Sequence, residues 1–395
     1  MRAEEVWYFR FNPPTTEDVD LAEYREEKLA QLEADVERYL RRAHISVLVR
    51  LCAQLLEKLE LASFPERTPL SDDWAYGVPL NDIKRLYTAL IHVDGFDPLK
   101  IHFVHKKASR QGAIPLLFCH GCDFIEVSKI LPLLANPERD DQPCFDVVAP
   151  SLPNFGFSSA PSKPGFGTLS NSTYAECCHK LMPKLGYSRY VTQGGNWEYA
   201  ITRSMGIKYG PAASSSLPAT VLATKRKRTL ARTKWFYEQG FAYNHVQSHN
   251  PSTIGPALRD SPVALLAWIY EKLHNWTDSY SWTDGKLLTW ISIYQFSEAG
   301  PEAACRIYYE HVHPFLDMRL LQYNPGVKLG LSTFPRDLIV SPRHYGQTLG
   351  PVVLERRHEE GGHFAAWEVP KLLVDDVRAI FAGLMAQGEL TVKVR

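Results

Sequence analysis

The chain has 395 residues, of which 45% are hydrophobic, which is enough for a large core and more than one structural unit. Its 44 Lys and Arg residues balance 44 Asp and Glu residues, so no net charge attracts nucleic acid or an anionic membrane. No apolar run approaches the roughly 20 residues that a membrane span needs, and no signal peptide is visible. The seven cysteines are scattered and lack metal-ligand spacing. We therefore expect a cytoplasmic protein with no metal and no cofactor.

The first 98 residues are predicted to form a helix-rich domain that has no visible catalytic pattern. Leu, Glu, Arg and Ala recur at helical spacing between about Val19 and Leu61, which indicates two or three helices. A short strand is predicted at Val6–Phe11 and a short helix near Asp82–Leu90. We interpret residues 1–98 as a packing and lid domain.

Strands and helices alternate from Leu99 onward. The predicted strands are Leu99–His105, Ile114–Cys119, Phe145–Ala149 and Arg189–Thr192, and the predicted helices between them are Ile125–Leu134 and Thr173–Leu185. This alternation predicts an α/β fold with a doubly wound, mostly parallel sheet, of which residues 99–223 form the first part. Active sites in such sheets lie at the carboxyl ends of the strands.

Helical runs replace the strand pattern from about Thr224 to Asp317. They are predicted at Thr229–Tyr243, Pro262–Asn275, Leu287–Phe296 and Pro301–Tyr309. We interpret residues 224–320 as a helical cap that interrupts the sheet. The strand pattern returns at Val327–Leu331 and Pro351–Arg356, and a helix is predicted from about Pro370 to Gln387, so residues 321–395 complete the core.

One stretch, residues 191–200, is arranged as a strand, a glycine turn and a helix. Gly194 and Gly195 allow a sharp bend, which is typical of the nucleophile elbow that lifts one side chain above an α/β sheet. The lifted side chain would be that of Asn196. Covalent catalysis needs Ser, Cys or a carboxylate at this position, and an amide is a poor nucleophile.

After an elbow, an acid and then a histidine should follow in the chain. Asp337 comes just past the predicted strand Val327–Leu331, and His363 comes just past the strand Pro351–Arg356. Asp337 would orient the imidazole and stabilise its protonated form, and His363 would act as a general base on water.

Four separated motifs resemble the microsomal-type epoxide hydrolases, including their soluble fungal members. They are Gln193–Trp197, Pro150–Ser158, Asp260–Lys272 and Gly361–Ala366, and the resemblance extends over nearly the whole chain, including the front domain. It implies an α/β-hydrolase core, a helical lid and an N-terminal domain of the epoxide hydrolase type. In that family an aspartate at the position of Asn196 attacks the epoxide carbon. The histidine–acid pair then activates the water that hydrolyses the ester.

The resemblance also implies a role for two tyrosines of the cap. Two lid tyrosines of the family hold the epoxide oxygen and protonate it as the ring opens. By motif they correspond to Tyr243, in Gly240-Phe-Ala-Tyr, and to Tyr308, in Arg306-Ile-Tyr. The residue pattern alone would favour packing within the lid for both side chains.

The chain departs from the family where the chemistry is expected. Asn196 replaces the aspartate, and the oxyanion loop lacks the family's proline, since it reads His-Gly-Cys-Asp. Glu198 stands where the family has a small residue that lets helix and strand pack closely. The residues that we expect around the pocket are His120, Gly121, Cys122, Asp123, Trp197 and Glu198.

Three hypotheses follow. The chain is a working epoxide hydrolase whose aspartate has been changed to Asn196, or a naturally divergent member of secondary metabolism, or an inactive ligand-binding scaffold. The divergent member would open, cyclise or isomerise an apolar epoxide, polyene or terpenoid by proton transfer. The partners that we expect are a small apolar substrate and, as an option, a second copy of the chain in a homodimer.

Overall fold

The computed structural model describes residues 90–92, 99–121, 124–166, 173–210, 213–218, 228–313, 318–340 and 344–390. The predictions for the front domain therefore lie almost wholly outside the described residues, as do the candidates Cys122 and Asp123. Residues 88–281 and 292–395 form one compact unit, and residues 282–291 belong to another. The sheet and the candidate site lie in the unit formed by residues 88–281 and 292–395.

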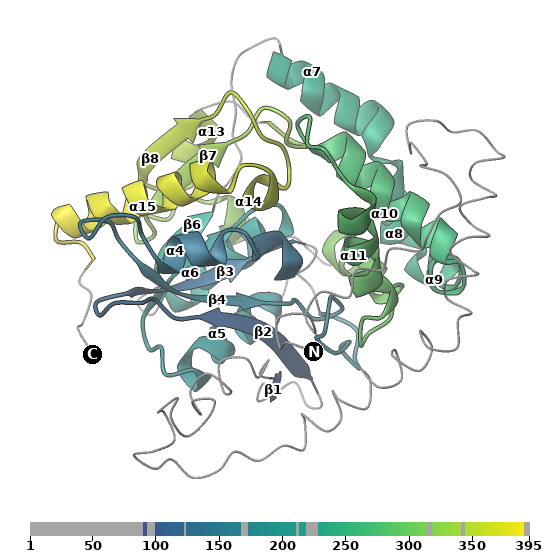
Figure 1. Ribbon diagram of the computed structural model, residues 1–395, viewed down its shortest axis with the longest axis horizontal. Coiled ribbons are helices and arrows are strands. Elements are labelled where there is room, and N and C mark those ends of the chain that lie inside the picture. The colour runs from purple at the N-terminus through teal and green to yellow at the C-terminus, as the bar shows by residue number, and fades with distance from the viewer. Residues whose placement is uncertain are drawn as a thin grey trace. The chain divides into compact units, whose positions relative to one another are not determined.

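A six-stranded sheet forms the centre of this larger unit, in the order β1-β2-β4-β3-β5-β6 (Figure 1). Strands β4, β3, β5 and β6 run parallel to one another. Strand β2 pairs antiparallel with β4, and β1 pairs antiparallel with β2. Two further parallel strands, β7 (Leu329–Thr333) and β8 (Val352–Arg357), form a separate two-stranded sheet, and β7 lies beside β6. The mostly parallel sheet confirms the predicted α/β class. The six strands are β1 (Leu90–His92), β2 (Lys100–Lys106), β3 (Ile114–Cys119), β4 (Phe145–Pro150), β5 (Tyr190–Gly194) and β6 (Ala213–Pro218).

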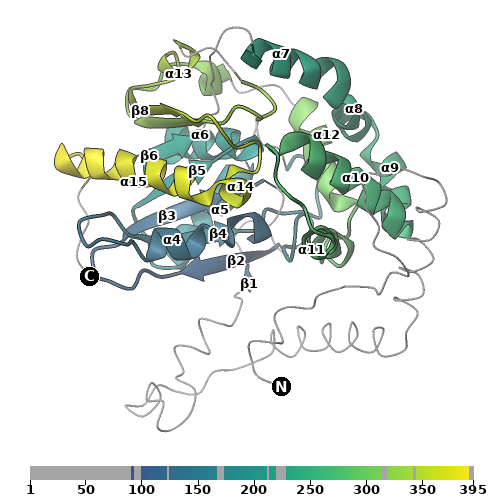
Figure 2. The ribbon, with the colours of Figure 1, turned by 45° about the horizontal axis from the view of Figure 1, so that its top comes forward.

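Helices cover both faces of the sheet, as expected for a doubly wound fold (Figure 2). Alternate residues of β3, such as Leu116 and Phe118, pack into one hydrophobic cluster with α4 (Leu131–Ala135) and α15 (Pro370–Ala386). Cys119 points to the opposite face, where its thiol contacts α5 (Thr173–Lys184). The same face carries α6 (Trp197–Tyr209), the helix that follows β5.

The segment between β6 and β7 is helical, as predicted, but its helices are shorter and more numerous. The predicted helical run Thr229–Tyr243 is helical over nearly its whole length, and a π-helical segment, η3, divides it between α7 and the start of α8. A further helix, α9, was not predicted because it contains two prolines. Ser261 caps α10 by accepting a hydrogen bond from the amide of Ala264. The elements are α7 (Arg228–Trp235), η3 (Phe236–Gly240), α8 (Ala242–His249), α9 (Pro251–Asp260), α10 (Pro262–Trp276), α11 (Asp284–Gln295), η4 (Ala303–Cys305) and α12 (Arg306–Val312).

Two other predictions need correction. The helix expected at Ile125–Leu134 is instead a 3-10 turn, η2 (Phe124–Val127), followed by α4. Pro132 lies in the first turn of α4, where its fixed φ and missing N–H favour a helix start. Strand β6 was missed because its sequence, Ala-Ser-Ser-Ser-Leu-Pro, has little apolar character. Short elements complete the described chain: η5 (Met318–Leu321), α13 (His344–Gln347) and α14 (Ala365–Glu368). None of the helices in these ranges is long and apolar enough to span a lipid bilayer.

A buried arginine ties α6 to the segments around β7. The guanidinium of Arg203 donates hydrogen bonds to the backbone carbonyls of Leu320, Gln322 and Leu349, and the residue is 1% exposed. Carbonyls buried in this way need a donor, because an unsatisfied buried polar group costs free energy. Arg203 therefore holds the helix that begins at the glycine turn against the part of the chain that carries Asp337.

Replacing Arg203 with Met should lower the free energy of unfolding by about 3 kcal/mol, because an apolar stem is kept but three backbone carbonyls lose a charged donor, and the bond to Leu320 is buried. Urea titration followed by circular dichroism measures this change. Arg139→Met is the matched control, since Arg139 pairs with Asp141 at an exposed position, and it should change the free energy by less than about 0.5 kcal/mol. Equal effects of the two substitutions would contradict the anchoring role of Arg203.

Candidate active site

Strand β5 ends in the turn that was predicted to be an elbow. Asn196, between the strand and α6, has φ of 53° and ψ of −126°, which residues other than glycine rarely adopt. Gly194 allows the close approach of strand and helix, because a Cβ atom there would lie 2.6 Å from the backbone oxygen of Glu198. The exposed side chain of Asn196 is thus presented at the tip of a strained strand-to-helix turn.

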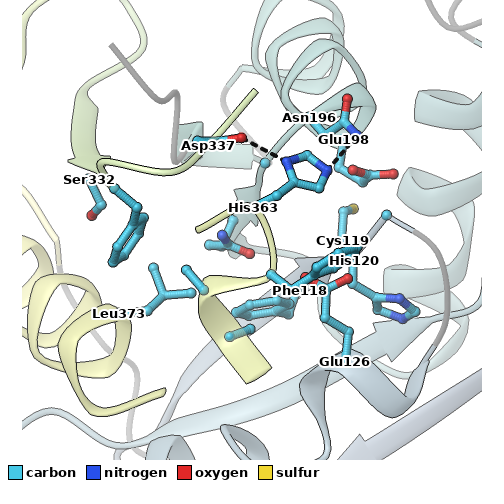
Figure 3. Close-up of a pocket in the computed structure, with 17 residues that line it drawn as sticks. Phe118, Cys119, His120, Glu126, Asn196, Glu198, Ser332, Asp337, His363 and Leu373 are labelled. Carbon is cyan, nitrogen blue, oxygen red and sulfur yellow. Dashed lines mark hydrogen bonds and ion pairs between the residues drawn. The ribbon is translucent and has the colours of Figure 1, made fainter. Parts of the chain in front are cut away.

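Two loops bring an acid and a histidine to this turn (Figure 3). The amide of Arg336 donates to the carbonyl of Gly361 at 3.1 Å, which fixes the loop after β7 beside the loop after β8. The Nδ1 atom of His363 lies 2.7 Å from Oδ1 of Asp337, and its Nε2 atom lies 3.0 Å from Nδ2 of Asn196. If Nδ1–H donates to Asp337, the Nε2 lone pair accepts the Asn196 amide hydrogen. Asn196, Asp337 and His363 therefore meet, as the spacing of their motifs predicted.

The electrostatic surroundings of His363 raise the pKa of its imidazole. Burial opposes the positive charge, since the side chain is 8% exposed. The carboxylate of Asp337, and then those of Glu126 and Glu368, outweigh this effect and raise the pKa of His363 above the ordinary 6.5. His363 is thus a stronger base than a free imidazole.

Tyr243, on α8, and Tyr308, on α12, lie edge to face with ring centroids 5.7 Å apart. The Tyr243 ring also contacts Trp276 at 5.2 Å, and Trp276 contacts the imidazole of His363 at 5.2 Å. Trp197, the first residue of α6, contacts Tyr308 at 5.5 Å. We call Trp197, Tyr243, Trp276 and Tyr308 the aromatic cluster, and it brings both predicted tyrosines to the cap side of His363.

The end of α10 is fixed to the loop that carries His363. The backbone amide of His363 donates to the carbonyl of Trp276 at 2.8 Å. The carboxylate of Glu368 accepts from the amide of Phe364 at 3.1 Å and from the amide of Asp278 at 2.7 Å. One side chain of the core thus joins the histidine loop to the residues that follow α10.

A cavity lies at the base of this arrangement, on the side of the carboxyl ends of β3 and β5. Of the predicted residues, Trp197, Tyr243 and Tyr308 do not line it, and they belong instead to the aromatic cluster. Burial lowers the pKa of His120, which does line it, to about 3, so this imidazole is neutral. No group of three or more His, Cys, Asp or Glu side chains in the described ranges is arranged to hold a metal ion. The predicted residues that line the cavity are His120, Gly121, Asn196, Glu198, Asp337 and His363.

Four further residues of the site were not predicted. Glu126 and Gln193 also line the cavity, and burial raises the pKa of Glu126 to about 7. The carboxylate of Glu368 does not line the cavity, but its charge raises the pKa of His363. Lys272 is 8% exposed, and its Nζ atom lies 5.1 Å from the ring centroid of Tyr243, within range of a cation–π contact. Lys272 and Gln193 carried a sequence signal, as the last residue of the motif Asp260–Lys272 and the first residue of the motif Gln193–Trp197.

Comparisons with known proteins agree with this geometry. The chain is 32% identical to Epoxide hydrolase 1 of Sus scrofa over 345 residues, which cover 75% of this chain and 74% of the relative. The solved structure of Aspergillus niger epoxide hydrolase matches with a TM-score of 0.64 and 29% identity, covering 83% of this chain and 93% of that chain. The structure of juvenile hormone epoxide hydrolase from the silkworm Bombyx mori also has a TM-score of 0.64, at 23% identity, with 88% and 93% covered. No protein-family model matches the chain.

We expect the stabilising effect of the His363–Asp337 pair to depend on pH. Because the pKa of His363 is higher in the folded protein than the ordinary 6.5, the folded state binds the proton more tightly than the unfolded chain. This stabilisation is complete below about pH 6.5 and is lost as the pH rises through the folded-state value. The difference in unfolding free energy between the parent chain and His363→Gln, from urea titrations across pH, should therefore shrink as pH rises.

Asp337→Asn is the control for this experiment, because it removes the carboxylate that raises the pKa of His363. The difference in unfolding free energy between Asp337→Asn and the double variant Asp337→Asn/His363→Gln should depend much less on pH. A difference between the parent and His363→Gln that grows with pH would contradict the charge state assigned to the pair.

Proposed function

Since this chain belongs to the epoxide hydrolase family and has its α/β-hydrolase fold, we propose that it opens an apolar epoxide by adding water directly, without an ester intermediate. In this proposal His363 and Asp337 are the base and its orienting acid, and Tyr243 and Tyr308 activate the epoxide oxygen. The observation that carries the proposal is the contact of 3.0 Å between Nε2 of His363 and the amide of Asn196.

The amide explains why the ester route is unsuitable. Formation of an alkyl-enzyme ester needs a carboxylate oxygen that attacks the epoxide carbon, and the side chain of Asn196 offers none. The imidazole, by contrast, keeps its orienting carboxylate at 2.7 Å and its raised basicity. General-base catalysis therefore remains available where nucleophilic catalysis does not.

The groups at the site account for each proton transferred and each bond formed or broken in direct hydrolysis. A water molecule replaces the Asn196 amide as the hydrogen-bond partner of Nε2, gives its proton to His363 and forms a bond from its oxygen to the epoxide carbon. The carbon–oxygen bond of the ring breaks, and a tyrosine hydroxyl gives its proton to the leaving alkoxide, which yields a diol. Asn196, 3.0 Å from Nε2, is suited to orient the attacking water through its amide.

The aromatic cluster supports both the apolar substrate and the role of the tyrosines. Its rings join the cap to His363 through successive ring contacts with centroids 5.2 to 5.7 Å apart, and Tyr243 is 9% exposed. The ammonium of Lys272, which pairs with the carboxylate of Glu271 at 2.6 Å, lies over the Tyr243 ring in a cation–π contact that fixes this ring. In this proposal residues 1–98 form an N-terminal domain, residues 224–320 the cap, and residues 99–223 with 321–395 the hydrolase core.

A second candidate function is isomerisation or cyclisation of an epoxide by proton transfer alone. The same observation favours it, because the amide of Asn196 occupies the position next to Nε2 that the attacking water requires. Tyrosine would then protonate the ring oxygen, and His363 would remove a proton from the substrate carbon skeleton. The product would keep the mass of the substrate.

A single-turnover experiment in isotopically labelled water distinguishes these routes. With enzyme in excess over each member of a panel of apolar epoxides, the first diol formed should carry oxygen from the solvent. Asn196→Asp is the matched control, since an ester route would put an unlabelled carboxylate oxygen into its first diol. Intact mass must first show that Asn196 has not hydrolysed to Asp, which adds about one mass unit.

The other outcomes of this experiment contradict direct hydrolysis or favour one of the alternative functions. Unlabelled oxygen in the first diol from the Asn196 protein would contradict direct hydrolysis. A product of unchanged mass would favour isomerisation. If neither protein converts any epoxide, the chain is a ligand-binding scaffold and the enzymatic proposal is wrong.

Tyr243→Phe and Tyr308→Phe should each lower kcat by about 10²-fold to 10³-fold and change KM little, because a donor to the developing alkoxide counts most in the transition state. Tyr309→Phe is the matched control, since Tyr309 is the next residue on α12, 39% exposed, and stacks on His313. Its kcat should equal that of the parent. Steady-state kinetics that show full kcat for either site variant would remove that tyrosine from the mechanism.

A further inference from the structure

Glu198 is a fully buried carboxyl group in the cavity beneath the elbow. It is 1% exposed, and neither of its oxygens has a hydrogen-bond partner elsewhere in the described part of the chain. The carboxyl lies against the backbone of Gly121, where an added Cβ would be 3.4 Å from its Oε2 atom. Figure 3 shows Glu198 next to Asn196, among the residues that line the cavity with His363.

A second buried polar group faces the same cavity. Gln193, on β5, is 4% exposed, and its Oε1 atom has no partner among the residues that the structure describes. Buried polar atoms in folded proteins are almost always paired with protein or with ordered water. A polar cavity that presents several such atoms to one space is the kind of cavity that holds water.

The groups around Glu198 favour its neutral form. Burial raises its pKa well above 4.5, and the charges of Glu126 and Cys178 act in the same direction, whereas its own backbone N–H acts against them. The N-terminus of α6 also favours a negative charge, but this effect is small beside the desolvation of a buried carboxylate. Of the other titratable groups nearby, Cys119 and Tyr174 carry no positive charge, and burial lowers the pKa of His120 to about 3. His363 also lines the cavity, and its positive charge is balanced by the carboxylate of Asp337 at 2.7 Å. Glu198 is therefore a carboxylic acid, with one O–H donor and a free acceptor oxygen.

We propose that Glu198, as a carboxylic acid, and Gln193 bind ordered water in this cavity and hold it beside His363. The O–H of Glu198 donates to a water oxygen, and Oε1 of Gln193 accepts a hydrogen from the same chain of waters. The water is thus fixed beneath the elbow, on the core side of His363, while the apolar substrate occupies the cap side. Glu198 acts through the water and is a positioning residue.

This inference rests on the proposed hydrolysis, in which His363 needs a water molecule at Nε2 while an apolar ligand fills the cap side. The aromatic cluster offers water few polar groups. The cavity offers them, and it is lined by His363 itself. Glu198 is less suited to act as an ionised nucleophile than as a neutral acid that binds water, because an unpaired buried anion carries a large desolvation cost.

The test uses two substitutions of nearly equal size. Glu198→Gln keeps a neutral group that donates and accepts hydrogen bonds, and Glu198→Leu keeps the volume but removes every polar atom. Infrared difference spectra of the parent against Glu198→Gln should show the carbonyl band of a protonated carboxylic acid at about pH 7. That band should shift in heavy water, and crystal structures should show the bound water in the parent and in Glu198→Gln but not in Glu198→Leu.

Kinetics test the positioning role separately. On an epoxide that the parent hydrolyses, Glu198→Leu should lower kcat by about 10-fold to 100-fold with little change in KM, while Glu198→Gln stays within about threefold of the parent. The thermal midpoint of Glu198→Leu should equal or exceed that of the parent, because the substitution removes a buried polar group without a protein partner. A merely structural role would instead lower stability and activity together.

The outcomes separate this inference from the proposed function. If the carboxylic acid band is absent, or if Glu198→Leu keeps the kcat of the parent, the water-holding role is wrong while hydrolysis stands. If Glu198→Gln is as slow as Glu198→Leu, Glu198 acts through ionisation and the proposal is overturned. If the parent hydrolyses no epoxide, the proposed function fails, and the spectra and crystal structures still decide whether Glu198 binds water.

Discussion

The site depends on one strained backbone position. Asn196 is held at positive φ, at a cost of about 1–3 kcal/mol for a residue other than glycine. The buried strand before it and the close packing at Gly194 maintain this conformation, and Arg203 fixes the helix after it. Because the turn is fixed on both sides, the amide stays at hydrogen-bond distance from His363. Asp337 and the aromatic cluster lie around this contact.

The unusual residues of the chain are neighbours in space as well as in sequence. Asn196 places an amide at the tip of the turn, and Glu198 places a carboxyl group on its buried side. In the proposed reaction, the amide at the tip cannot form an ester, and the buried carboxyl group holds water for direct attack on the epoxide.

Much of the fold was predictable because it depends on local pattern. The apolar run Ile114–Cys119 is a buried strand with the expected bounds, and the order of Asn196, Asp337 and His363 predicted that they would meet. The pattern failed where local signals were weak, as at the serine-rich strand β6. It also could not show that Glu126 and Glu368 act on His363, since their approach depends on how separate loops and helices pack.

Glu368 gives the two halves of the site a shared support. Its carboxylate holds an amide of the histidine loop and an amide just past α10, so the position of the imidazole and the position of the cap end are coupled. An engineer who wishes to change which molecules enter should therefore vary α9 and leave α8, which carries Tyr243, and the last turn of α10 untouched. In the proposed reaction, substrate range can then change in α9 while the side chains that transfer protons keep their positions.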